Sequence, residues 1–335
     1  MRLRISIFFG LMLFLFSGCS LKQQVRGEYY LDSGKYEQGV AYFEEEFMKH
    51  REDPRTNYYL GRFYIAEGAY EKGLLHLKRA ALLDQQNADN YFWLGIAHAA
   101  NNQKDLERSS YLKALQIKSD HIQALTYLGH NYFEKAQLEK ALLTYDRVLK
   151  IWPENPSALF NRALILKHEK RTFEEKPAWK RYLAVTASGT KARQAVENLN
   201  AAGDFDYRNY LIGRRIVTLK RIDFKPATPV IRKDTRLSLD VLGSVLENNQ
   251  NIAIHVVAYQ KNNRKLAEDR ALAIKQYLLK KFSKIHPSRL KLSWFDVPEN
   301  INIGETGHLY HVDESVNFIT AIDQHKGKGF VAGRR

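Results

Sequence analysis

Small and large apolar residues recur at a fixed spacing through the first part of the chain. A glycine returns every 34 residues, at Gly27, Gly61, Gly95 and Gly129. A large apolar residue stands sixteen positions after each glycine, at Phe43, Leu77, Tyr111 and Tyr145. A small residue lets two helix backbones approach closely, and a large one on the facing helix fills the space beside them. The spacing therefore predicts two antiparallel helices in each 34-residue unit.

The same pattern continues in a weaker form. Residues 156–189 form a degenerate fifth unit, in which Ala163 takes the glycine position and Trp179 and Tyr182 take large positions of the second helix. We expect residues 190–200 to form a closing helix, because the last unit of a repeat array would otherwise leave an apolar face exposed. The predicted helical array spans residues 20–203.

Beyond this array, segments with apolar residues at strand spacing alternate with segments with apolar residues at helical spacing. Alternating residues predict strands at residues 217–224, 252–258, 290–295 and 315–322. Apolar residues at helical spacing predict helices at residues 234–246 and 263–282. Strands that alternate with helices indicate an α+β domain, which we place at residues 210–325.

The first residues predict export. Arg2 and Arg4 precede an apolar run at residues 5–16, and Ser17 and Gly18 precede Cys19, so residues 1–19 have the order of a secretory signal. The run is shorter than the ~20 residues that a transmembrane helix needs. Cys19 is the only cysteine of the chain, which excludes an internal disulfide. The alternative is an uncleaved anchor beside a buried free cysteine.

Composition and charge narrow the class of partner. The chain of 335 residues has a formal net charge of +15, and residues 326–335 form a basic tail. Charge alone would attract nucleic acid, anionic lipid or anionic polymer. An exported protein does not meet nucleic acid in its ordinary surroundings, so we expect none as a partner.

Candidate chemistry is sparse. The chain has no phosphate-binding glycine-rich loop, no usable cysteine nucleophile and no acid–base pair at a recognisable spacing, so we expect neither an enzyme nor a cofactor. His308 and His311 lie near Glu305 and Asp313 in a segment that we interpret as a glycine-containing loop. Such histidines are more often polar loop residues than ligands, and we expect no metal site.

The 34-residue pattern resembles the tetratricopeptide repeat (TPR) family. The resemblance implies an all-α solenoid that binds proteins in a concave groove lined by the first helix of each unit. The groove candidates are Arg55, Tyr58, Arg62, Phe92, Ile96, Thr126, His130 and Phe133. This aromatic and weakly basic set suits an amphipathic helix or an extended segment. The alternative is that Phe92 and Ile96 pack against a neighbouring unit.

The α+β region resembles the OmpA-like peptidoglycan-binding domain, a βαβαββ sandwich. The residues that carry this resemblance are Ile222, Asp223, Phe224, Asn263, Leu266, Ala267, Arg270, Ala271 and Ile274. In that family an arginine at the position of Arg270 holds a carboxylate of diaminopimelate, and a planar guanidinium fits a carboxylate at two points. The resemblance therefore implies Arg270 and Asn263 as peptidoglycan-binding residues.

The chain departs from that family beside the expected ligand. Lys261 stands where the family has the aspartate that holds the ligand's ammonium group, and a lysine there would repel an ammonium. The loop between Lys261 and Asn263 is short, and Asp313-Glu314-Ser315 replaces a basic motif of the family. The alternative is that Arg270 pairs with Glu268 or Asp269 in a fold that serves another purpose.

Residues Phe16-Ser17-Gly18-Cys19 resemble a bacterial lipobox, and Ser20 follows. The resemblance implies lipidation at Cys19 and a place on the periplasmic face of the outer membrane. Together the patterns predict an anchored scaffold lipoprotein that binds protein partners through its repeats and contacts peptidoglycan. The alternative is an assembly factor, or pilotin-like component, of a pilus, secretion or motility machine, in which the C-terminal domain no longer binds peptidoglycan.

Overall fold

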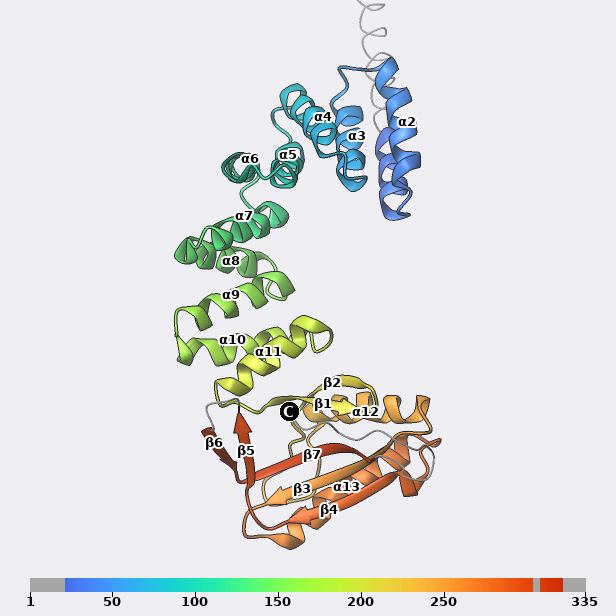
Figure 1. Cartoon of the computed structure of the whole chain (residues 1–335), viewed down its shortest axis with the longest axis vertical. Helices are drawn as coiled ribbons and strands as arrows, with labels where there is room; N and C mark the ends of the chain where they lie inside the picture. The colour runs from blue at the N-terminus through green and yellow to red at the C-terminus, as the bar shows by residue number, and fades with distance from the viewer. Residues whose placement is uncertain (1–21, 304–307, 322–335) are drawn as a thin grey trace, which may run out of the picture. The chain divides into compact units, whose positions relative to one another are not determined.

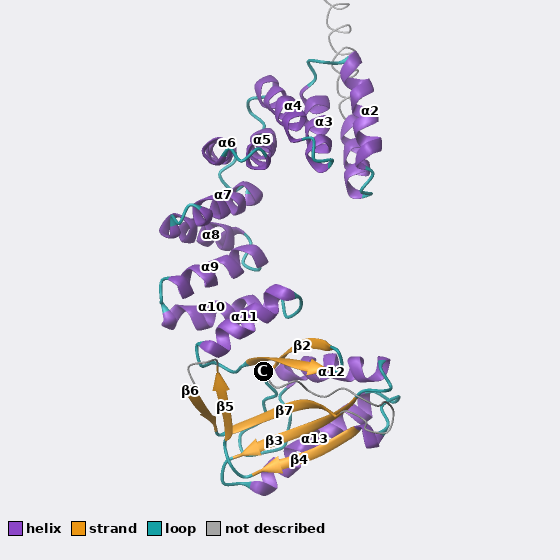
Figure 2. Cartoon of the chain, viewed as in Figure 1, coloured by secondary structure: helices purple, strands orange, loops and turns teal. Residues whose placement is uncertain are grey.

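The computed structural model describes residues 22–303 and 308–321. The predicted signal at residues 1–19, with Cys19, and the basic tail at residues 326–335 lie outside the described residues. The chain divides between Ala158 and Leu159 into two compact units. The domain boundary predicted near residues 203–210 stays a prediction. Figure 2 shows that the strands belong to the C-terminal part of the chain.

The first unit is a series of paired helices, coloured blue to green in Figure 1. It begins with a helical segment at residues 22–32. The helices that follow are α2 (Tyr36–Lys49), α3 (Pro54–Ala66), α4 (Tyr70–Leu83), α5 (Ala88–Ala100), α6 (Lys104–Ile117), α7 (Ile122–Glu134) and α8 (Leu138–Ile151). Helix α9 (Pro156–His168) spans the division between the units. These bounds follow the predicted 34-residue period.

Side-chain caps start the first helix of successive units. Asp53 Oδ2 accepts a hydrogen bond from the Thr56 amide at 2.7 Å, and Pro54 occupies the first turn of α3. Asn87 Oδ1 caps α5 through the Asp89 amide at 3.0 Å. A helix N-terminus leaves backbone donors without intrahelical partners, and these side chains supply the missing acceptors. The caps therefore fix where each repeat restarts.

Glycines allow the two helices of a unit to touch. A Cβ atom added at Gly95 would lie 2.3 Å from Tyr111 Cε1, and one at Gly129 would lie 2.7 Å from Tyr145 Cε1. Both tyrosine side chains are fully buried. The predicted pairing of a small residue with a large one sixteen positions later is confirmed at both sites.

The second unit opens with helices and continues into strands. Helices α10 (Thr172–Val185) and α11 (Thr190–Ala201) lie where the fifth unit and closing helix were predicted. Phe160 packs edge-on against the rings of Trp179, at 5.4 Å, and Tyr182, at 5.1 Å. The paired helices predicted from the 34-residue period are thus present through α11.

The strands of the described residues form three small sheets. The elements are β1 (Tyr207–Ile212), β2 (Arg215–Lys220), α12 (Arg236–Asn248), β3 (Ala253–Gln260), α13 (Arg264–Lys281), β4 (Leu290–Phe295), β5 (Glu299–Ile303), β6 (His308–Val312) and β7 (Glu314–Ala321), with short 3-10 turns at Lys233–Thr235 and Pro287–Arg289. Hairpins β1–β2 and β5–β6 make two of the sheets, and the third has the order β4-β3-β7.

The three-stranded sheet carries the core of this region. Strand β3 pairs in parallel with β4 and antiparallel with β7. Because parallel neighbours need a crossover, α13 connects β3 to β4. Alternate residues of β3, Ile254 and Val256, are fully buried in one core with Ala271 and Ile274 of α13. Residues on one face of the strand therefore hold the helix that carries Arg270.

Helix α11 packs on the first hairpin of this region. Asn200 Nδ2 donates to the backbone oxygens of Asp204, at 2.8 Å, and Tyr207, at 2.9 Å. Lys180 Nζ lies 2.8 Å from Asp204 Oδ2. The closing helix and the strands that follow it are therefore joined within one compact unit.

Several sequence-based expectations need correction in this region. Strands β1, β5 and β6 were not predicted, and the strand expected to reach residue 224 ends at Lys220. His308 and His311 lie in β6 rather than in a loop, because the chain doubles back against β5. Within residues 22–303 and 308–321, no cluster of three or more side chains is suited to a metal ion. No helix in this described part is long and apolar enough to cross a membrane.

Candidate functional site

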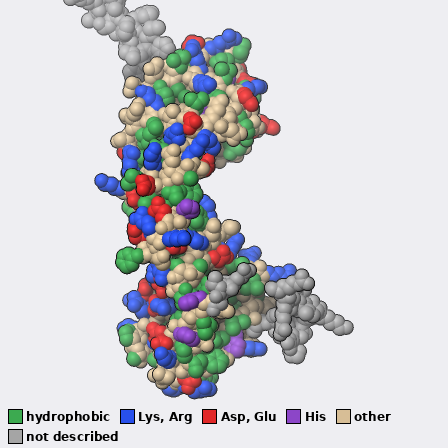
Figure 3. Space-filling model, turned by 60° about the vertical axis from the view of Figure 1, so that its left-hand side comes forward, with side chains coloured by type: hydrophobic (Ala, Val, Ile, Leu, Met, Phe, Trp, Pro, Cys, Tyr) green, Lys and Arg blue, Asp and Glu red, His purple; other side chains and the backbone are tan. Residues whose placement is uncertain are grey.

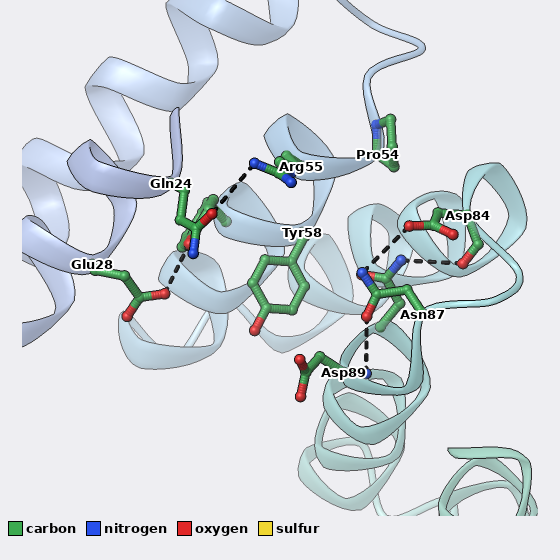
Figure 4. A pocket seen from close by; sticks show the side chains of 10 residues that line it. Gln24, Glu28, Pro54, Arg55, Tyr58, Asp84, Asn87 and Asp89 are labelled. Atoms are coloured by element: carbon green, nitrogen blue, oxygen red, sulfur yellow. Dashed lines mark hydrogen bonds between the residues drawn. The ribbon is translucent and has the colours of Figure 1, made fainter. Parts of the chain in front are cut away.

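A cavity of about 210 Å³ lies between the first helices of the first three repeats. Figure 4 shows the Tyr58 ring standing between Gln24 and Glu28 on one side and Asn87 and Asp89 on the other. The cavity is lined by Gln24, Glu28, Pro54, Arg55, Tyr58, Tyr59, Asp84, Asn87, Asp89 and Asn90. Its charged walls hold more carboxylates than cations, so this part of the groove is acidic rather than weakly basic.

Arg62 is engaged within the wall and does not reach out as a free cation. Its Nη1 atom lies 3.4 Å from Glu28 Oε1 and donates to Tyr58 Oη at 3.0 Å. Its guanidinium lies 4.3 Å from the centre of the Trp93 ring. Burial raises the pKa of Tyr58 to about 12, so its phenol stays neutral. Because Tyr58 accepts from Arg62, its own hydroxyl proton is left for another acceptor.

A second cavity of about 420 Å³ continues along the same array. It is lined by Asp89, Lys118, Asp120, His121, Ile122, Gln123, Thr126, Tyr127, Trp152 and Asn155. Asp89 lines both cavities, because it stands in the first turn of α5 between them. The two cavities therefore adjoin at Asp89.

Asp89 is held in place by a buried histidine. His121 Nδ1 accepts from the Ala124 amide at 3.1 Å, which caps α7. The other ring nitrogen, Nε2, lies 3.0 Å from Asp89 Oδ1. Since Nδ1 acts as an acceptor, the proton belongs on Nε2, and His121 donates to the carboxylate. This hydrogen bond outweighs partial burial and lowers the pKa of Asp89, so Asp89 is anionic.

The groove residues predicted from the repeat register lie in different surroundings. Arg55 and Tyr58 line the first cavity and Thr126 lines the second. Phe92 is only 6% exposed and packs with the rings of Tyr111 and His121, as the alternative interpretation expected. Phe92 therefore belongs to the packing between helices and not to the groove surface.

The remaining predicted groove residues are half-buried, and none lines either of these two cavities. His130 packs between the rings of Tyr127, at 5.5 Å, and Tyr145, at 5.9 Å. Ile96 and Phe133 are also half-buried. Sequence reasoning missed Asp89, His121 and Trp152. The spacing of the helix caps was the signal available in the sequence, because Asn87, His121 and Asn155 follow one another at intervals of 34 residues.

Arg270 lies in a second, unrelated site in the C-terminal unit. Its side chain is 4% exposed. Nη1 lies 2.9 Å from Glu314 Oε2 and also donates to Gln260 Oε1, while Nε donates to the Thr228 oxygen at 3.2 Å. The guanidinium lies 4.7 Å from the Phe224 ring centre. The chain's own Glu314 therefore provides the carboxylate that the family resemblance assigns to a ligand.

The other two predicted residues of this site have structural contacts. Lys261 Nζ lies 3.2 Å from Asp313 Oδ1, and the Lys261 amide donates to the Asp313 oxygen at 2.8 Å. Asn263 caps α13, since its Oδ1 accepts from the Leu266 amide at 3.0 Å. Lys261 is thus matched with Asp313, just before β7, as Arg270 is matched with Glu314, the first residue of β7.

The expected alternative partners of Arg270 are wrong. Glu268 and Asp269 face Lys265, at 3.5 Å and 2.9 Å, instead of Arg270. The alternative was right that an internal acid pairs with Arg270, but that acid is Glu314 on β7 and not a neighbour on α13.

Little space remains beside Arg270. The cavity there has a volume of about 10 Å³ and is lined by Arg221, Ile222, Asp223, Phe224, Arg270, Glu314 and Ser315. This is about the space that one water molecule needs. A ligand carboxylate can reach the guanidinium only if Glu314 leaves its ion pair with Arg270.

The first repeats match a known protein family. Residues 25–90 match the family model described as tetratricopeptide repeat. Comparison with curated proteins gives no significant match.

Several solved structures resemble the chain. MamA is 19% identical, with 52% of this chain and 96% of MamA covered, at a TM-score of 0.42. YrrB, described as a TPR protein with an unusual peptide-binding site, is 15% identical, with 50% of this chain and 87% of YrrB covered, at a TM-score of 0.44. PilF of Pseudomonas aeruginosa is 14% identical, with 53% and 81% covered, at 0.49.

Proposed function

We propose that this chain is a non-enzymatic scaffold that binds a protein partner in the groove of its TPR array. TPR proteins generally mediate protein–protein interactions. The observation that carries the proposal is the pair of cavities, of about 210 Å³ and 420 Å³, that adjoin at Asp89. The walls combine exposed aromatic and charged side chains, which suits a peptide segment better than a small metabolite.

Affinity capture tests this function. Gln123 is exposed on the wall of the second cavity, so Gln123→Trp fills the groove without entering the core. Leu143 is 67% exposed on α8, which makes Leu143→Trp the matched control. The proposal expects one envelope protein to be retained by the unmodified chain and by Leu143→Trp, and lost by Gln123→Trp. Equal retention by all three chains would contradict groove binding.

We further propose that the protein is a lipoprotein held at Cys19 on the periplasmic face of the outer membrane. Support comes from the order of basic, apolar and small residues before Cys19. Labelling with a radioactive fatty acid, followed by membrane fractionation, tests the proposal. The label should be present in the unmodified protein and absent from Cys19→Ser. Equal labelling of both proteins would disprove the anchor.

The C-terminal region has two candidate roles. An OmpA-like module that contacts peptidoglycan is supported by the succession of β3, α13, β4 and β7 and by Arg270 on α13. An assembly-factor role without peptidoglycan binding is supported by Glu314, which already neutralises Arg270. We favour the second role, because the cavity beside Arg270 holds about one water molecule.

Sedimentation with peptidoglycan sacculi separates the two roles. If the assembly-factor role is correct, the unmodified chain stays in solution. If the peptidoglycan role is correct, the unmodified chain sediments and Arg270→Ala abolishes the binding. Glu314→Gln and Lys261→Asp are informative variants, because one removes the charge that neutralises the guanidinium and the other restores the family's carboxylate at position 261. A gain of binding in these variants would show a site that the chain's own charges close.

A further inference from the structure

The groove of the first unit has a charge opposite to that of the whole protein. The chain has a formal net charge of +15, and Figure 3 shows acidic and basic side chains interspersed on the face in view. The charged residues that line the two cavities, apart from the histidine, are Glu28, Asp84, Asp89, Asp120, Arg55 and Lys118. Carboxylates therefore outnumber cations in the groove, which gives it a local preference for positive ligands.

Most of these carboxylates already have partners within the wall. Glu28 accepts from Tyr59 Oη at 2.8 Å and pairs with Arg62. Asp84 accepts from Asn87 Nδ2 at 3.3 Å. Asp89 differs, because its side chain is 65% exposed and it faces both cavities while His121 holds one of its oxygens. Its position is fixed, and the second oxygen is left to accept a ligand's hydrogen bonds, although the charges of Lys118 and Arg62 also act on this carboxylate and lower its pKa.

The surfaces on either side of Asp89 suit the stem of a long cationic side chain. Tyr58 stands beside Asp89 in the first cavity, as Figure 4 shows. Tyr127 and Trp152 line the second cavity, and they are 41% and 46% exposed. Lysine and arginine bury their methylene stems along such apolar surfaces, and aromatic faces attract their charged ends.

We propose that the groove selects a partner segment with a lysine or arginine that pairs with Asp89, flanked by apolar residues that pack on Tyr58 and Trp152. This inference rests on the proposed function and names the chemistry of the partner. Charge complementarity is its basis, because a basic side chain neutralises the one carboxylate that lies in both cavities. His121 acts as a positioning residue that orients this carboxylate.

A random library of 12-residue peptides displayed on phage provides the probe. The library is selected on the full chain with Cys19→Ser, and the enriched peptides are synthesised with a fluorescent label. The inference expects enriched sequences to share a lysine or arginine between apolar residues. Binding of each peptide is then measured by fluorescence polarisation against the unmodified chain, Asp89→Asn and Asp120→Asn.

Asp89→Asn should weaken binding by about tenfold, because a hydrogen bond to a charged group is lost. Asp120→Asn is the matched control in the same cavity and should change affinity by less than about twofold, as expected for an exposed charge. Replacing the peptide's basic residue with glutamine should weaken binding to the unmodified chain equally and add nothing in Asp89→Asn. Circular dichroism shows whether each variant is folded.

Different results overturn different statements. Groove-dependent peptides without a basic residue, or equal affinity for Asp89→Asn, would overturn this inference and leave the proposed function standing. If no selected peptide loses its binding when the chain carries Gln123→Trp, both this inference and the proposed function are overturned. A synthetic peptide of residues 326–335 is included as a competitor. If it binds with the same dependence on Asp89, the occupant is the chain's own basic tail and the proposal of a separate partner fails.

Discussion

The pairing of Arg270 with Glu314 gives a measurable prediction about the C-terminal region. Glu314→Gln keeps the size of the side chain and an oxygen that accepts from Arg270, but it removes the negative charge. The guanidinium is 4% exposed and keeps its contacts with the Thr228 oxygen and the Phe224 ring. The substitution therefore tests the charge alone and leaves the packing around the arginine in place.

The expected size of the effect follows from the exposure of the two partners. Exposed ion pairs contribute ~0.2–1 kcal/mol, and breaking a fully buried pair costs ~3–5 kcal/mol. Arg270 is buried, whereas Glu314 is 56% exposed, so we expect a loss of about 1–2 kcal/mol between these limits. The control is Asp313→Asn, since Lys261 and Asp313 are 49% and 63% exposed. It should cost at most about 0.5 kcal/mol.

Native-state hydrogen exchange, read by mass spectrometry on peptides of α13 and β3, measures this local stability. A loss of 1–2 kcal/mol corresponds to about five- to thirtyfold faster exchange of the protected amides. Glu314→Gln should show this acceleration and Asp313→Asn should not. If both variants exchange at the rate of the unmodified chain, Glu314 does not neutralise Arg270 in solution and the reasoning about a closed site is refuted.

Three further outcomes are expected. Gly95→Ala should destabilise the array by ~1–3 kcal/mol in denaturant titrations, because its Cβ would lie 2.3 Å from Tyr111; Gly95→Ala/Tyr111→Leu should regain part of this loss. Although burial raises the pKa of Glu299, hydrogen bonds and the charge of Arg208 lower it overall. The stability advantage over Glu299→Gln should therefore be present above the ordinary glutamate pKa of ~4.3 and be lost as pH falls below that value. His121→Asn keeps a cap acceptor and should be ~1 kcal/mol more stable to denaturant than His121→Ala.

The array was predictable from the sequence because its decisive contacts repeat locally. Gly95 and Tyr111 belong to one helical pair, so their fixed spacing reports a contact directly. The spacing could not show which way an aromatic residue turns. Phe92 occupies a groove position in the register but packs inward on Tyr111 of its own unit and on His121 of the next unit. The second contact depends on the neighbouring repeat.

The Arg270 site was only half predictable for the same reason. The sequence places Arg270 in the second turn of a helix, and the structure confirms that position. Its partner Glu314 is brought near by the antiparallel register of β3 and β7, in which Gln260 stands opposite Glu314. The apolar pattern fixes which face of each strand is buried. It does not show which residue of a strand far along the chain lies opposite Gln260.

Photo-crosslinking at the groove tests the central claim most directly. Benzoylphenylalanine is placed at Asp120, an exposed residue on the wall of the second cavity where a substitution should leave affinity almost unchanged, or at Leu143 on the exposed surface of α8. In illuminated cells, the account predicts one discrete protein adduct from position 120, weakened when Asp89→Asn is also present, and none from position 143. Identical adducts from both positions, or none from position 120, would contradict a partner bound in the groove of the helical array.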